Sequence, residues 1–184
     1  MQRRSFLKTA AAILPAASLQ AFALDQPSSA STEVHVIPGG EDRLGEAHSL
    51  GFSTICFKVL PSETSNSLFV IEHIHLTGGP DLHIHPHQEE YFYLLEGEVV
   101  FQVGDARKHL HPGDSVLAPR GIPHCFAATN AIPSRMIIAF TPAGKMEQFF
   151  RETANLTKAQ MTPEIWARYD LTYVGPSPLK DLKA

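Results

Sequence analysis

Short runs rich in β-branched and aromatic residues recur through most of this chain, and glycine, proline, asparagine and aspartate separate them. Runs of this length with regular turn signals between them predict an all-β sandwich or barrel. The predicted strands cover residues 52–60, 68–76, 83–85, 91–95, 98–103, 108–110, 115–118, 124–127 and 135–140.

Local signals also predict two hairpin turns and a helical tail. Residues 104–105 and 96–97 both have the composition of hairpin turns. Apolar side chains then recur at helical spacing over 145–156. A second helix is expected over 162–169, because a threonine at the N-cap precedes a proline at the first helical position. Residues 175–178 contain two prolines and are expected to be extended or irregular.

Composition limits the class of protein. A chain of 184 residues is enough for one domain, and 43% hydrophobic with 18% charged residues fits a globular fold rather than a disordered one. A formal net charge of −4 gives no basic surface for nucleic acid, so we expect a small-molecule partner and no nucleic acid. The two cysteines, Cys56 and Cys125, cannot build a disulfide framework, although a single bond between them stays open.

The N-terminus has the three parts of an export signal. Residues 1–23 combine a basic start, an uncharged apolar middle too short to span a bilayer, and a small-residue ending at Ala23. The paired arginines near the start resemble the twin-arginine type, which an export machinery reads. We therefore expect a periplasmic or otherwise exported protein without a stable membrane span. Residues 24–33 would be a flexible lead-in and 34–184 a single domain.

Histidines are crowded into one short segment. His83, His85 and His87 lie within five residues, and Glu90 follows. On a strand, residues two apart project from the same face, so the first two imidazoles point together. A turn at residues 86–87 can bring the carboxylate on the next strand to the same interior. Two neutral imidazoles and a carboxylate form a good site for a divalent first-row metal ion.

A further histidine, His124, follows a strand-like run and a tight turn at residues 119–121. Alone, such a histidine is more often structural than a ligand. Together, the two segments resemble the two sequence motifs of the cupin superfamily. The matching residues are His83, His85, Glu90 and Gly97 in the first motif, and Gly113, Pro119, Gly121 and His124 in the second. This chain departs from the second motif at its last position, where Ala128 replaces an asparagine whose role is missing or taken by Asn130.

The resemblance implies a small antiparallel β-barrel of the cupin or jelly-roll type, with a short C-terminal helical tail from about residue 145. It also implies one metal ion held by His83, His85, Glu90 and His124. His87 is a rival ligand, because residues 85–87 also read His-x-His. Iron, manganese, nickel, copper and cobalt suit these ligands, and we expect one of them rather than zinc. Cupins commonly pair through their β-sheets, so a homodimer is expected.

A narrower similarity covers residues 51–178, which resemble single-domain bacterial cupins grouped with quercetin 2,3-dioxygenases, with shared features at 89–98 and 140–144. This resemblance implies a metal-dependent oxidoreductase, a dioxygenase that cleaves a flavonol or another enolisable aromatic with O2. Glu90 would then be a catalytic base as well as a ligand. There are two alternatives. One is an isomerase or decarboxylase, and the other is a non-catalytic periplasmic protein that binds a small ligand or a metal.

Strand alternation suggests which side chains surround the substrate. Phe92 would share the face of Glu90, and Phe126 the face of His124, so both could form walls of an apolar pocket, with His87 at its mouth. Ordinary core packing is the alternative for both phenylalanines. His73 and His75 also share a predicted strand face, but no carboxylate follows at the needed distance, so we expect both to be structural.

Overall fold

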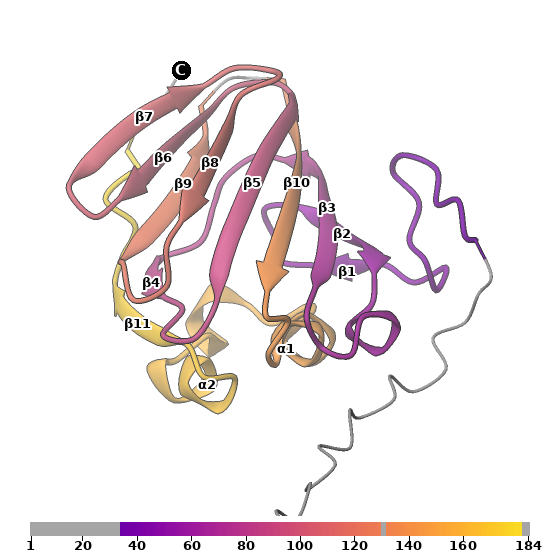
Figure 1. The fold of residues 1–184 in the computed structure, drawn as a ribbon. Helices are drawn as coiled ribbons and strands as arrows, with labels where there is room; N and C mark the ends of the chain where they lie inside the picture. Colours follow the sequence, from indigo (N-terminus) through magenta and orange to yellow (C-terminus); the bar gives the residue numbers. More distant parts are fainter. Residues whose placement is uncertain (1–33, 130–131, 182–184) are drawn as a thin grey trace, which may run out of the picture.

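The computed structural model describes residues 34–129 and 132–181 (Figure 1). The predicted export signal over 1–23, the predicted lead-in over 24–33 and Asn130 lie outside these residues. The described chain forms two antiparallel β-sheets packed face to face, with α-helices gathered at one end of them. No helix in this part of the chain is long and apolar enough to cross a membrane.

The strands are β1 (His48–Ser49), β2 (Thr54–Val59), β3 (Phe69–Leu76), β4 (Leu82–Ile84), β5 (Glu89–Glu96), β6 (Val99–Val103), β7 (Ala106–Leu110), β8 (Ser115–Ala118), β9 (His124–Ala128), β10 (Ser134–Thr141) and β11 (Thr172–Gly175). The helical segments are η1 (Pro61–Glu63), α1 (Met146–Thr153), η2 (Lys158–Gln160) and α2 (Pro163–Arg168). The six-stranded sheet has the order β1-β2-β3-β10-β5-β8, and the five-stranded sheet has the order β11-β4-β9-β6-β7.

Strand β5 shows how the sequence selects this arrangement. Its residues alternate between the two faces of the sheet, as the period of two of a strand requires. Phe92 and Leu94 are completely buried between the sheets, whereas Tyr91 and Tyr93 are more than a third exposed on the outer face. A phenylalanine-rich core therefore forms where the inner faces of the two sheets meet.

The predicted strands are confirmed, with ends that shift by at most two residues. The sequence does not predict the short edge strands β1 and β11. Helix α1 is shorter than the predicted 145–156, and α2 follows Thr162 and begins at Pro163, as the N-cap signal predicts. The two α-helices lie together at one end of the sheets (Figure 1), where their apolar side chains extend the core.

One of the two predicted hairpins is wrong. Residues 104–105 do connect β6 and β7, with Val103 opposite Ala106. Residues 96–97, in contrast, lead from one sheet to the other, because β5 pairs with β10 and β8 and never with β6. Gly97 has φ +82° and lies so close to Ser134 that a Cβ atom would be 2.2 Å from its Oγ. A tight turn signal therefore marks a crossover between sheets here.

The predicted all-β fold of the jelly-roll type, with a short helical tail, is confirmed. The predicted barrel has the form of a sandwich, because the strands described here fall into two separately hydrogen-bonded sheets. Cys56 and Cys125 are both buried and free rather than joined.

A candidate metal centre at the end of an apolar cavity

Four buried side chains from both sheets converge on one point. His83 on β4 lies directly opposite His124 on β9 in the five-stranded sheet, and His85 follows β4. Glu90 reaches them from β5 of the facing sheet. One ligand atom from each of the four residues lies within 4.8 Å of the other three, and every one of the four side chains is at least 94% buried. The cluster could hold a metal ion, as the sequence predicts.

The three imidazoles are oriented by the oxygen atoms behind them. Nδ1 of His83 donates a hydrogen bond to the carbonyl oxygen of Asp81 at 2.8 Å, and Nδ1 of His124 donates to that of Ile122 at 2.9 Å. A carbonyl oxygen only accepts, so each Nδ1 carries a proton. Each Nε2 is then the atom left to bind a metal, because a histidine ligand is fixed by the hydrogen bond of its other nitrogen.

His85 depends on a side chain that the sequence did not single out. Its Nδ1 lies 3.2 Å from Oε1 of Gln88, and Nε2 of Gln88 donates to the carbonyl oxygen of Ala143 at 2.8 Å. Because Nε2 of Gln88 donates to the carbonyl oxygen of Ala143, the oxygen Oε1 is the end of the amide that faces His85. Gly144 has φ +56°, and a Cβ atom there would lie 2.2 Å from Nε2 of Gln88. The only signal for Gln88 in the sequence is its position between the histidines and the glutamates.

Glu90 is the electrostatic centre of the cluster. Its Oε2 lies 2.8 Å from Nε2 of His124 and 3.2 Å from Nε2 of His85. Burial alone would raise the pKa of Glu90, but these two imidazoles lower it well below its usual range. Burial opposes protonation of His124, whereas the hydrogen bond to Glu90 favours it, and the net effect is a raised pKa.

His83 behaves differently, although it belongs to the same cluster. Burial, followed by the charges of His124 and His85, lowers its pKa to about 3. Its imidazole is therefore neutral at pH 7, and its lone pair is available to a metal. The cluster combines an ionised carboxylate with imidazole nitrogens whose lone pairs can bind a metal. Such a site binds a cation rather than an anion.

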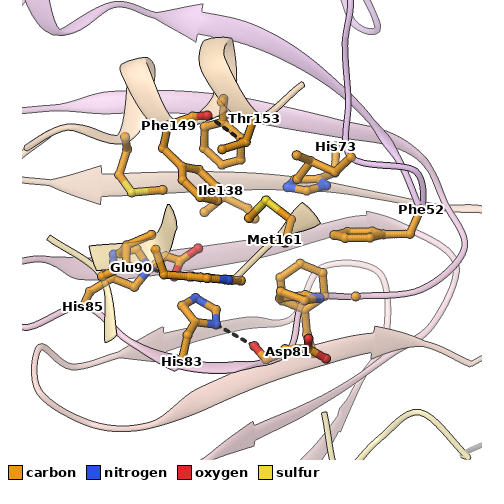
Figure 2. A pocket seen from close by; sticks show the side chains of 18 of the residues that line it. Phe52, His73, Asp81, His83, His85, Glu90, Ile138, Phe149, Thr153 and Met161 are labelled. Atoms are coloured by element: carbon orange, nitrogen blue, oxygen red, sulfur yellow. Dashed lines mark hydrogen bonds and ion pairs between the residues drawn. The ribbon is translucent and has the colours of Figure 1, made fainter. Parts of the chain in front are cut away.

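A cavity of about 140 Å³ begins at this cluster. Figure 2 shows Glu90, His85 and His83 at one side of it, and Phe52 and His73 at the other. Its walls are mostly apolar and come from both sheets and from the C-terminal helical segments. They include Phe52, Phe126, Ile138, Phe140, Phe149 and Met161. At its edge Nζ of Lys158, in η2, pairs with Asp81 at 3.1 Å.

The predicted pocket residues take different places. Phe126 lines the cavity. Phe92 is completely buried in the core, with its ring 4.7 Å from that of Phe101, and it does not line the cavity. His87 is exposed and belongs neither to the four-residue cluster nor to the cavity wall. The turn at residues 86–87 directs this histidine away from the interior.

The prediction that His73 and His75 share a strand face is wrong. His73 is 2% exposed and lines the cavity, whereas His75 is exposed and has φ +53°. The ladder between β3 and β10 is irregular at the same place, between Ser134 and Met136. A bulge of this kind breaks the period of two, so the sequence pattern could not show which histidine faces inward.

Comparisons with known proteins agree with this geometry. Residues 70–140, which include all four residues of the cluster, match the family model described as "Cupin domain". The tetracenomycin polyketide synthase protein TcmJ of Streptomyces glaucescens is 28% identical over 98 residues, which cover 52% of this chain and 65% of that protein. The HTH-type transcriptional regulator PuuR of Escherichia coli strain K12 is 43% identical over 54 residues, 29% of each chain.

The chain therefore spans less than two thirds of either curated relative. In fold, it is similar to the crystal structure of an RmlC-like cupin from Shewanella frigidimarina, with a TM-score of 0.52 and 20% identity over 62% of this chain and 96% of the other. This chain is therefore similar to cupins in the domain matched over residues 70–140, and its two-sheet fold resembles that of the RmlC-like cupin.

Proposed function

We propose that this chain is a metal-dependent oxidoreductase, a dioxygenase that cleaves an enolisable aromatic compound with O2. The observation that carries the proposal is the convergence of four buried ligand atoms at one end of an apolar cavity. His83, His85, Glu90 and His124 would hold one divalent first-row ion. Such an ion supplies Lewis-acid and redox chemistry to a bound oxygen compound.

Glu90 is the residue we propose as the catalytic base. Both of its contacts with imidazoles use Oε2. Among the described residues Oε1 has no hydrogen-bond partner, and Glu90 lines the cavity. A substrate hydroxyl in the cavity would donate its proton to Oε1, which turns an enol into the more reactive enolate.

The size of the cavity supports a small substrate. A volume of about 140 Å³ is close to the roughly 150 Å³ of an engineered cavity that takes up benzene. One six-membered ring fits that space. A flavonol has three rings, so it would need the segment that carries Lys158 and Met161 to move outward. We therefore propose a single-ring enolisable compound ahead of a flavonol.

A second candidate is chemistry on the same enol without oxygen, as in an isomerase or a decarboxylase. The relative TcmJ is described as a polyketide synthase protein, and it supports an enolisable substrate for either chemistry, because polyketides are carbonyl-rich compounds. The relative PuuR, a transcriptional regulator, favours binding of a small ligand without turnover.

We also propose export and pairing. Residues 1–23 would direct the chain to the periplasm through the twin-arginine machinery. Tyr91, Tyr93 and Leu117 leave an apolar patch on the outer face of the six-stranded sheet, where Tyr91 lies opposite Leu117. A second copy of this chain would cover the patch in a homodimer, because apolar residues grouped on a surface favour association.

Metal content and oxygen uptake test the catalytic proposal. We expect about one redox-capable ion per chain in protein purified from its exported form, and none in His124→Ala. Glu90→Gln should lower oxygen uptake by about 100-fold or more, because an amide accepts no proton. Glu89→Gln is the matched control, because Glu89 pairs with Arg120 outside the cavity.

Each outcome selects one function. Full oxygen uptake by Glu90→Gln would exclude Glu90 as the catalytic base. Substrate conversion without oxygen uptake would favour the isomerase or decarboxylase, and binding without conversion would favour the binding protein. A folded chain that takes up none of the first-row ions would overturn the metal-dependent function altogether.

A further inference from the structure

His73 is a buried polar residue that the proposed chemistry does not use. It lies on β3, is 2% exposed, and lines the cavity on the side opposite the four-residue cluster (Figure 2). Its ring is stacked on that of Phe52 and meets the ring of Phe126 edge-on, with centroids 6.4 and 5.9 Å apart. These two contacts fix the plane of the imidazole in an otherwise apolar wall.

The hydrogen bonding of His73 leaves one nitrogen for a ligand. Nδ1 lies 2.8 Å from Oγ of Ser53, and within the described part of the chain Nε2 has no hydrogen-bond partner. A hydroxyl group can donate or accept, unlike the carbonyl oxygens behind His83 and His124. His73 can therefore present either a proton or a lone pair at Nε2, according to what the ligand offers.

The environment keeps this imidazole neutral. Burial lowers the pKa of His73 to about 4, although the charge of Glu90 acts in the opposite direction. Burying a polar group without a partner costs free energy that an apolar side chain would not. A neutral group with a free nitrogen suits an uncharged polar atom of a ligand better than an anion.

Strand register places His73 and Glu90 at the two ends of the cavity. On β10, Met136 lies opposite His73, and Phe140 lies opposite Glu90. These two β10 positions are four residues apart, or about 13 Å along the strand. Ile138, between them, lines the cavity. The cavity is thus polar at both ends and apolar in the middle, with room for one ring.

We infer that His73 is a second anchor of the cavity, whose Nε2 hydrogen-bonds an uncharged polar group at the end of the substrate remote from the metal cluster. The inference rests on the proposed function in that the same cavity holds the substrate. It specifies the substrate class as a single-ring compound with enol or phenol oxygens at one end and a hydroxyl or carbonyl group at the other.

Two catechols that differ by one hydroxyl group test the inference. The probes are 4-methylcatechol and 3,4-dihydroxybenzyl alcohol, titrated by calorimetry under anaerobic conditions against zinc-loaded protein. We expect the ring hydroxyls to occupy the metal end in both probes, so that only the distal substituent differs. Trp166 lines the cavity and is the only tryptophan in the sequence, so its fluorescence reports that each probe is inside.

We expect the benzyl alcohol to bind about threefold to tenfold more tightly than the methyl compound, which is the effect of one neutral hydrogen bond. His73→Phe should abolish this preference and leave the affinity for 4-methylcatechol nearly unchanged. His73→Gln should keep part of the preference, because an amide also donates and accepts. His75→Asn is the matched control, because His75 is an exposed histidine on the same strand.

The possible failures are distinguishable. Equal binding of the two probes, or the same preference in wild type and His73→Phe, would overturn the anchoring role. The absence of binding by both probes would overturn it as well. The titrations are repeated on metal-free protein, where the ring hydroxyls can donate to Glu90. A chain that takes up no zinc therefore contradicts the metal site alone. The comparison of wild type with His73→Phe can then still be made on the metal-free protein.

Discussion

At the scale of single residues, the position of each imidazole in the cluster depends on the group behind it. Gln88 accepts from His85 and at the same time donates to the carbonyl oxygen of Ala143. Gln88→Leu replaces the amide with an apolar side chain and removes both bonds. We expect the dissociation constant for the metal to rise about 10- to 100-fold, as for other groups that orient a ligand. Competition with a chelator measures it.

Gln148→Leu is the matched control for this prediction, because Gln148 is an exposed glutamine on α1 whose amide donates to Glu152, away from the metal cluster. Metal affinity in the control should equal that of the wild type. Unchanged metal affinity in Gln88→Leu would mean that Gln88 is not needed to orient His85. The packing of the His85 ring against that of Phe140, with centroids 5.7 Å apart, would then be enough.

At the scale of elements, the connection from β3 to β4 determines how closely the chain before His83 lies on β9. A Cβ atom on Gly79 would lie 1.7 Å from the carbonyl oxygen of Phe126 and 2.6 Å from its carbon. Both are backbone atoms, so Gly79→Ala must push the connection and the strand apart. We expect a loss of about 1–3 kcal/mol or more in the free energy of unfolding, together with weaker metal binding.

Urea unfolding and a metal titration measure these two effects. Gly175→Ala is the control, because no described residue other than its chain neighbours has an atom within 4 Å of the added Cβ, and its backbone conformation is open to other residues. It should change stability by less than about 0.5 kcal/mol. Equal stability of the two variants would show that the connection can move away without cost, and that the close contact does not hold His83 in place.

At the scale of the whole molecule, folding moves histidines from water into the interior, and this makes stability depend on pH. Burial lowers the pKa of His73 to about 4 and that of His83 to about 3, from an ordinary value of 6.5. At a pH between each lowered pKa and the ordinary value of 6.5, the unfolded chain binds protons that the folded chain does not. The metal-free protein should therefore lose stability as the pH falls below about 6.5, by at most about 1.4 kcal/mol per pH unit for each histidine.

Urea unfolding of metal-free protein at pH 7, 6 and 5 measures this slope. His73→Gln removes one of the two groups, so its stability should fall less steeply than that of the wild type, whereas His75→Asn should leave the slope unchanged. Parallel slopes in His73→Gln and the wild type would mean that other groups cause the acid instability.

The sequence by itself determined most of the strands and the shared face of His83 and His85, whereas the full set with Glu90 and His124 came from the resemblance to the cupin motifs. The strands and the shared face are local properties, because the period of two orients His83 and His85 together, and turn residues end each run. Their chemistry also follows from residue type, since two imidazoles and a carboxylate close together suit a first-row metal ion. The N-cap signal at Thr162, which predicts the start of helix α2, also depends only on neighbouring residues, and it is confirmed.

Only the tertiary structure decided how these parts are used. It made residues 96–97 a crossover between sheets, because the partner of a strand depends on contacts far away in the sequence. It turned His73 into the cavity and His75 outward through a bulge that no local pattern marks. It also placed Gln88 behind His85 through the carbonyl oxygen of Ala143, 55 residues later. Side-chain periodicity and turn chemistry are encoded locally, whereas strand partners, bulges and cavity walls arise from the packing of distant segments.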